Sequence, residues 1–255
     1  TIHHQPTTIL VIMCGRYAIP DPAAVERLCA TDFKRGFSWM RPLFNVAPAT
    51  QVPILVKDAG NGLATRGARW GLIPSWWQKD APPPPAINAR SEEVAEKPLW
   101  RDSFKSVRCL MPALGWYEWN ANQLVPGKAG RQGGQPYFIS CPGAEAIAFA
   151  ALWSIWQCSG AEPVVSCALL TKPAASGMAF IHPRMPVVLK PGQFGAWLDP
   201  TATREQLLAL VAAARDDFAS HPVSTRVNNA RNDGPELIEK AAVATTDSLD
   251  FGGSP

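Results

Sequence analysis

The sequence has 255 residues, of which 47% are hydrophobic and 18% charged, and its 24 basic and 21 acidic residues give a formal net charge of +3. That length and apolar content suffice for one substantial core. The small net charge excludes a strongly cationic DNA-coating protein, so any binding of nucleic acid must come from a local patch. No apolar run approaches the roughly 20 residues of a membrane span, so we expect no membrane partner.

Six cysteines are present, and none forms a C-x-x-C pair. Because structural zinc sites need closely spaced ligands, we predict neither a metal nor another cofactor. The start of the chain lacks the basic n-region and small-residue cleavage site of a secretory signal. We therefore expect a cytoplasmic protein with reduced thiols at the cysteines after the first, which are Cys29, Cys109, Cys141, Cys158 and Cys167.

The first 77 residues contain one clear helix signal and two strand signals. Asp21 as N-cap and Pro22 in the first turn predict a helix that continues through Ala30. An apolar run bounded by turn residues predicts a strand at 52–56. A second strand should begin the segment 63–77, which then ends in a Pro-Trp-Trp loop.

Prolines dominate the next segment of the chain. The run 80–86 should form an extended, exposed polyproline spacer. Residues 91–104 have helical character near both ends, and we expect Pro98 to break the helix.

The second half of the chain alternates β-forming runs with Gly/Pro turns, which predicts strands within 108–119, 136–140, 146–156 and 164–171. The polar, basic segment 120–135 is expected to be a long mobile hairpin loop, and 201–215 is the clearest amphipathic helix. The 25 prolines also disfavour a helix bundle. We predict a single α+β domain of strongly bent, mostly antiparallel, barrel-like sheets with flanking helices.

Four short islands place polar groups in apolar surroundings: "MCGRY", "INARSE", "GWYEW" and "IHPRMPV". Each has a simple structural explanation when taken alone. Cys14 suits a core position, Asn88 suits a helix cap, Glu118 suits the solvent face of a strand, and His182 suits a turn.

Together, these islands resemble the SRAP family, the SOS-response-associated peptidases. The match also includes "FNVAPAT", "RWGLIPSWW", "KPLW" and "HPVSTRVNN", and it runs from Cys14 to about Ile238. The resemblance implies an SRAP domain at 14–240, with residues 1–13 as a leader that is absent or removed in the active form. The small, polar composition of 241–255 predicts a disordered tail.

The resemblance implies a monomer that senses abasic sites in single-stranded DNA, including strand junctions. It would shield the lesion through a covalent thiazolidine cross-link to Cys14, in the cytoplasm and at the nucleoid after damage. Asn88 and Glu118 would line the pocket of Cys14, and His182 would complete it. By the same resemblance the DNA contacts are Trp76, Trp77, Arg90 and Arg184, with Arg16 as a plausible phosphate contact.

The chemistry of an N-terminal cysteine supports this interpretation. An α-amine with a pKa near 7.7–8.0 is partly neutral at physiological pH, whereas a lysine amine is not. The amine can form an imine with the aldehyde of an opened abasic sugar, and the thiol of the same residue can then close a five-membered ring. Glu118 beside aromatic rings could have the raised pKa that a proton shuttle needs, and His182 can exchange protons near neutral pH.

This chemistry requires a primary amine at Cys14, yet twelve residues precede Met13. Translation could start at Met13 and be followed by its removal, the leader could be released by self-cleavage, or the leader could persist and keep the protein inactive. We favour the first because "MCGRY" already looks like a complete beginning.

Three other functions remain open. The chain could be an N-terminal-nucleophile cysteine amidohydrolase, a peptidase acting on other proteins through Cys14 and His182, or a non-catalytic DNA-binding module.

Overall fold

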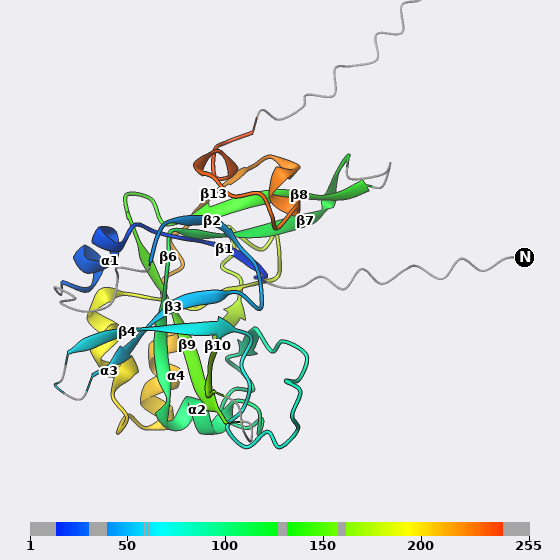
Figure 1. Cartoon of the computed structure of the whole chain (residues 1–255). Helices are drawn as coiled ribbons and strands as arrows, with labels where there is room; N and C mark the ends of the chain where they lie inside the picture. The colour runs from blue at the N-terminus through cyan, green and yellow to red at the C-terminus, as the bar shows by residue number, and fades with distance from the viewer. Residues whose placement is uncertain are drawn as a thin grey trace, which may run out of the picture.

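Two β-sheets dominate the computed structural model, which describes residues 14–30, 40–58, 60, 62–126, 132–157 and 162–241. The smaller sheet lies at the top of Figure 1 and the larger sheet below it. The leader at 1–13 and residues 242–255 of the expected tail lie outside the described residues.

The smaller sheet has five strands in the order β13-β8-β7-β1-β2. In chain order these are β1 (Arg16–Ile19), β2 (Leu43–Val46), β7 (Gly115–Pro126), β8 (Gln132–Ser140) and β13 (Ala219–Pro222). All of its pairings are antiparallel, and Arg16 of β1 lies opposite Tyr117 of β7. This register brings the residues before β1 next to Glu118.

The larger sheet closes on itself. Strand β10 pairs with both β4 and β9, which completes the ring β4-β3-β6-β9-β10. The strands are β3 (Gln51–Lys57), β4 (Leu63–Trp70), β5 (Asn88–Arg90), β6 (Arg108–Ala113), β9 (Ile147–Trp156), β10 (Val164–Pro173), β11 (Arg184–Pro186) and β12 (Val188–Leu189). Only the pairings of β10 with β4 and with β5 are parallel, so the prediction of bent, mostly antiparallel, barrel-like sheets is confirmed.

Aromatic side chains join the two sheets. The ring centroid of Phe149 on β9 lies 5.9 Å from Tyr17 and 6.1 Å from Trp116 of the smaller sheet, and all three side chains are buried. Burying a side chain of this size contributes about 1.5–3 kcal/mol. Trp116 and Glu118 point to the same face of β7 because side chains alternate along a strand, so Glu118 faces the larger sheet.

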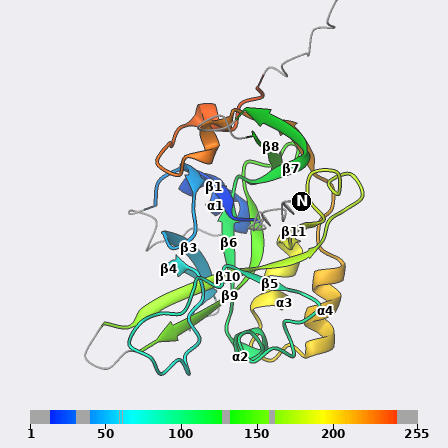
Figure 2. The ribbon, with the colours of Figure 1, turned by 90° about the vertical axis from the view of Figure 1, so that its right-hand side faces the viewer.

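Short helices cover the ring at the end away from the β7–β8 hairpin, where α2, α3 and α4 lie in both views (Figures 1 and 2). The helices are α1 (Pro22–Cys29), α2 (Arg101–Ser106), α3 (Phe194–Leu198) and α4 (Arg204–Ala212), and the 3-10 turns are η2 (Pro191–Gln193), η3 (Thr225–Asn228) and η4 (Pro235–Leu237). The predicted N-cap Asp21 accepts a hydrogen bond from the Ala23 backbone N at 2.9 Å.

Two predictions of local structure are wrong. Residues 91–96 form turns rather than a helix, and only the C-terminal end of that segment becomes helical, as α2. The expected loop at 120–135 is instead largely the outer part of the β7–β8 hairpin, in which Asn120 pairs with Gln135 and Leu124 with Gly134. Residues 127–131 at its tip lie outside the described residues.

Candidate active site

Cys14 and Glu118 are in direct contact between the two sheets. The Cys14 backbone N donates to Glu118 Oε1 at 2.9 Å, and Cys14 Sγ donates to the same oxygen at 2.7 Å. Cys14 adopts a left-handed backbone conformation with φ 42°, which turns both of its polar atoms toward one carboxyl group. Sulfur and nitrogen therefore share a single proton acceptor.

Burial sets the protonation of this pair. Cys14 and Glu118 are each 1% exposed. Desolvation raises the pKa of Glu118 to about 8, against the smaller opposing effect of its two hydrogen bonds from Cys14. Desolvation, and then the negative charge of Glu118, raises the pKa of the Cys14 thiol. Both groups therefore hold their protons at neutral pH.

Asn88 and Arg90 enter the site region on β5, beside the C-terminal half of β10. Leu169 of β10 pairs with Asn88, and Thr171 pairs with Arg90. Asn88 is half-buried and Arg90 is exposed. Strand β11 lies on the other side of β10, where Arg184 pairs with Pro173. The sheet thus brings Arg184 into the region of Asn88 and Arg90, although nearly a hundred positions separate it from them in the sequence.

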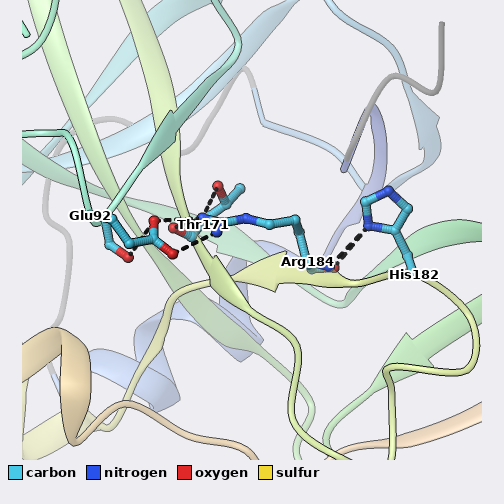
Figure 3. Close-up of polar contacts among 5 residues, drawn as sticks. Glu92, Thr171, His182 and Arg184 are labelled. Carbon is cyan, nitrogen blue, oxygen red and sulfur yellow. Dashed lines mark hydrogen bonds and ion pairs between the residues drawn. The ribbon is translucent and has the colours of Figure 1, made fainter.

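His182 and Arg184 are joined by a local hydrogen bond (Figure 3). His182 Nδ1 lies 3.1 Å from the Arg184 backbone N and 3.2 Å from the Arg184 carbonyl oxygen. It accepts from the N–H in the tautomer that carries its proton on Nε2, and it donates to the carbonyl in the other tautomer. Burial is the main cause that lowers the pKa of His182, so the ring is neutral at pH 7. A neutral ring with its proton on Nε2 is a hydrogen-bond donor for a substrate oxygen.

Arg184 reaches away from His182 to an acidic partner that sequence reasoning missed. Its guanidinium forms a two-pronged ion pair with Glu92, at 2.6 and 2.9 Å, and donates to the Thr171 carbonyl at 2.8 Å (Figure 3). The acidic pair in "SEE" next to "INAR" is the only sequence signal for this contact. Arg184 also connects the two parts of the site, because its positive charge acts to lower the pKa of Cys14.

The two neighbouring tryptophans differ in exposure. Trp76 is 46% exposed, whereas Trp77 is half-buried and donates from Nε1 to the Ala81 carbonyl at 2.8 Å. Their ring centroids are 6.4 Å apart, and Lys79 lies 5.5 Å from the Trp77 ring. Trp76 therefore offers an open aromatic face, and Trp77 supports the loop that carries it.

Arg16 has a structural partner. Its Nη1 donates to Asn45 Oδ1 at 2.7 Å and to the Val227 carbonyl at 3.0 Å, so the guanidinium holds η3 against the smaller sheet. The predicted phosphate contact would have to use the remaining N–H groups of this side chain. Asn45 is buried and also donates to the carbonyls of Val227, Asn229 and Asn232.

The described part of the chain holds no group of three or more His, Cys, Asp or Glu side chains that could bind a metal ion. It also has no helix that is both long and apolar enough to cross a membrane.

The fold and the site define a protein built around one cysteine, whose nitrogen and sulfur contact one carboxyl between two bent sheets. The sequence model of the SOS response associated peptidase (SRAP) family matches residues 13–230. This chain therefore belongs to the SRAP family.

Several curated proteins are similar over most of this chain. Abasic site processing protein YoqW of Bacillus subtilis is 34% identical over 231 residues, which cover 89% of this chain and 99% of that protein. YedK of Escherichia coli, with the same descriptive name, is 32% identical over 234 residues, with coverages of 89% and 99%. Abasic site processing protein HMCES of Gallus gallus is 32% identical over 269 residues. The matched region covers 89% of this chain and 77% of that protein.

Solved structures show the same fold. A protein from Bacteroides thetaiotaomicron superposes with a TM-score of 0.71 at 17% identity, covering 90% of this chain and 100% of that chain. A phage-related protein from Bordetella bronchiseptica gives a TM-score of 0.64 at 26% identity, covering 83% of this chain and 95% of the other.

Proposed function

We propose that this protein recognises abasic sites in single-stranded DNA and becomes covalently linked to them through Cys14. The observation that carries the proposal is the contact of both Cys14 N and Cys14 Sγ with Glu118 Oε1, at 2.9 and 2.7 Å. Membership of the SRAP family and the similarity to proteins named for abasic site processing support it.

The first bond forms between nitrogen and carbon. The Cys14 amine adds to the aldehyde carbon of the opened sugar and gives a carbinolamine. Glu118, protonated at neutral pH because its pKa is about 8, transfers its proton to the hydroxyl group, which leaves as water. The products are a protonated imine and the Glu118 carboxylate.

The second bond forms between sulfur and the same carbon. The raised pKa of the Cys14 thiol means that no thiolate is present beforehand. The new Glu118 carboxylate removes the thiol proton across the existing contact, and the sulfur attacks the imine carbon. The ring closes to a thiazolidine with a neutral nitrogen, and Glu118 is protonated again.

The remaining site residues would hold the sugar and the strand. In this proposal His182 Nε2 and the Asn88 amide donate hydrogen bonds to the sugar oxygens. Arg90, Arg184 and Arg16 contact the phosphates. Trp76 would stack on a base, an interaction worth about 1–3 kcal/mol. We further propose a monomer that acts in the cytoplasm, at strand junctions among other sites.

The active form in this proposal begins at Cys14. In the chain of 255 residues the Cys14 nitrogen belongs to a peptide bond and cannot form an imine. The family match begins at residue 13, immediately before Cys14. The left-handed conformation of Cys14 costs about 1–2 kcal/mol. A first residue has no backbone φ, so loss of the leader would remove this conformational cost.

The test is intact mass after mixing the protein with a single-stranded oligonucleotide that contains one abasic site. Protein expressed from Met13, with that methionine removed, should gain the mass of the oligonucleotide minus water. The chain of 255 residues should gain it only if it first loses residues 1–13, which would reveal self-cleavage.

Matched controls separate the competing functions. Cys14→Ala in the form that starts at residue 14 should not form the heat-stable adduct. Equal cross-linking by both N-terminal forms, without loss of the leader, would refute the amine mechanism. Hydrolysis of glutamine without DNA would instead favour the amidohydrolase, and tight binding without an adduct would favour a non-catalytic DNA-binding module.

A further inference from the structure

Phe180 stands out among the described apolar side chains because it is large, 52% exposed and close to the candidate site in sequence and in space. It lies two residues before His182 in the segment that joins β10 to β11. Sequence reasoning gave it no role. In Figure 2 the β7–β8 hairpin lies above β11, and Phe180 makes one aromatic contact with that hairpin.

That contact is with Tyr137 of β8. The two ring centroids are 5.6 Å apart and the ring planes are nearly perpendicular, at 89°. Such an edge-to-face pair leaves at least one face of Phe180 uncovered. Tyr137 is itself fixed, because its hydroxyl donates to Gln123 Oε1 at 2.7 Å.

Tyr137 also places the pair beside the reacting groups. It is the direct cross-strand partner of Glu118, so both side chains project from the same face of the smaller sheet. Directly opposed side chains in an antiparallel pair have Cβ atoms about 4.5–5.5 Å apart. The open face of Phe180 is therefore separated from Glu118 by a single side chain.

The segment that presents Phe180 is held rigidly. Met178 and Ile181 are buried on either side of it in sequence. Backbone hydrogen bonds from Met178 N to the Ala175 carbonyl at 2.8 Å and from Ile181 N to the Met178 carbonyl at 3.0 Å wind the segment into a turn. The exposed ring thus loses little conformational freedom when it binds a flat ligand.

We infer that Phe180, supported by Tyr137, is a stacking site for the nucleobase that adjoins the abasic position. This inference rests on the proposed function, which supplies single-stranded DNA as the ligand. A nucleobase fits the chemistry because any base has a π-face, and stacking on an aromatic side chain is sequence-tolerant. Phe180 lies on the loop of His182, whereas Trp76 lies on the separate loop after β4. The two rings would then hold different nucleotides of the strand.

The experiment measures non-covalent binding by fluorescence anisotropy. The probe is a single-stranded oligonucleotide with one tetrahydrofuran residue, an abasic analogue that lacks the aldehyde. Protein starting at Cys14 and the chain of 255 residues are measured in parallel. Phe180→Ala should weaken binding about 5- to 150-fold, whereas Phe180→Trp should retain it. Leu124→Ala is the matched control, because Leu124 is 57% exposed on the neighbouring hairpin and should leave binding unchanged.

A second set of oligonucleotides identifies the base. Replacing the base on one side of the lesion by another tetrahydrofuran should weaken wild-type binding by a similar factor. With that oligonucleotide, wild type and Phe180→Ala should bind equally. Binding by Phe180→Ala that equals wild type with both bases present would overturn the inference. The inference would also be overturned if Phe180→Ala still bound more weakly than wild type whichever flanking base is removed. That result would indicate a purely structural role for Phe180.

The covalent reaction distinguishes this inference from the proposed function. At saturating oligonucleotide with a true abasic site, wild type and Phe180→Ala should both form the adduct. If wild-type protein starting at Cys14 forms no adduct, the proposed function fails. If the adduct forms but binding does not depend on Phe180, only the stacking site fails.

Discussion

Two carboxyl groups of this molecule, Glu118 and Glu92, have opposite environments. Glu118 is 1% exposed and has a pKa of about 8, raised by desolvation. The Glu92 side chain is 45% exposed, and its hydrogen bond to Arg184 lowers its pKa. One carboxyl is thus a proton carrier at neutral pH, and the other is a fixed negative charge. The comparison shows that burial, more than residue type, decides what a carboxyl can do here.

The largest expected difference is in the rate of cross-linking. Glu118→Gln keeps the shape of the side chain but cannot take or give a proton, so the rate should fall about 10²- to 10⁴-fold. Glu92→Gln is the matched control and should change the rate much less. Adduct formation by protein starting at Cys14, followed on denaturing gels, measures both. A cross-linking rate of Glu118→Gln near that of wild type would contradict the role of Glu118 as a proton carrier.

The second prediction concerns stability against pH. Glu118 binds its proton more tightly in the folded protein, with a pKa of about 8, than in the unfolded chain at about 4.5. Between these values the unfolded state holds fewer protons, so stability falls as pH rises, by about 1.4 kcal/mol per pH unit. Glu118→Gln should remove this slope. Urea unfolding of both proteins at several pH values measures it, and parallel pH profiles would contradict the assignment.

The smallest effect is expected at the exposed pair. Glu92→Gln should change the free energy of unfolding by less than about 1 kcal/mol, because solvent screens an ion pair that is 14% and 45% exposed. It also removes a negative charge beside Arg184, so binding to single-stranded DNA should become tighter at low salt and converge with wild type at high salt. Anisotropy titrations at several salt concentrations test this. A loss of affinity would mean that Glu92 positions Arg184 for its phosphate.

The sequence was most informative where local signals and residue patterns are strong. Asp21 and Pro22 marked the start of α1, and the alternating runs located the main strands. The four islands, through their resemblance to a known family, predicted that Glu118 lines the pocket of Cys14, and the structure places the two residues in contact. Local signals failed at 120–135, where glycine and basic residues are typical of loops but cross-strand pairing between β7 and β8 prevails.

Other contacts between distant segments could not be predicted from one sequence. Three such contacts depend on how segments far apart in the chain come together. They are the Glu92–Arg184 ion pair, the hydrogen bonds from Asn45 to the η3 region and the ring contact of Phe180 with Tyr137. Nothing in the sequence around any of these residues indicates its partner. The pairing of β5 and β11 with β10 places Glu92 near Arg184. The path of the chain after β13 places the η3 region beside Asn45, and its path after β10 places Phe180 beside Tyr137.

The double pairing of β10 has a consequence for biosynthesis. Until residues 164–173 have left the ribosome, β4 and β9 each present an uncovered row of backbone hydrogen-bonding groups. A nascent chain that is stalled before this strand cannot close the ring and is open to association with other chains. Strand β10 therefore completes a barrel whose strands β3, β4, β6 and β9 have all been synthesised before it.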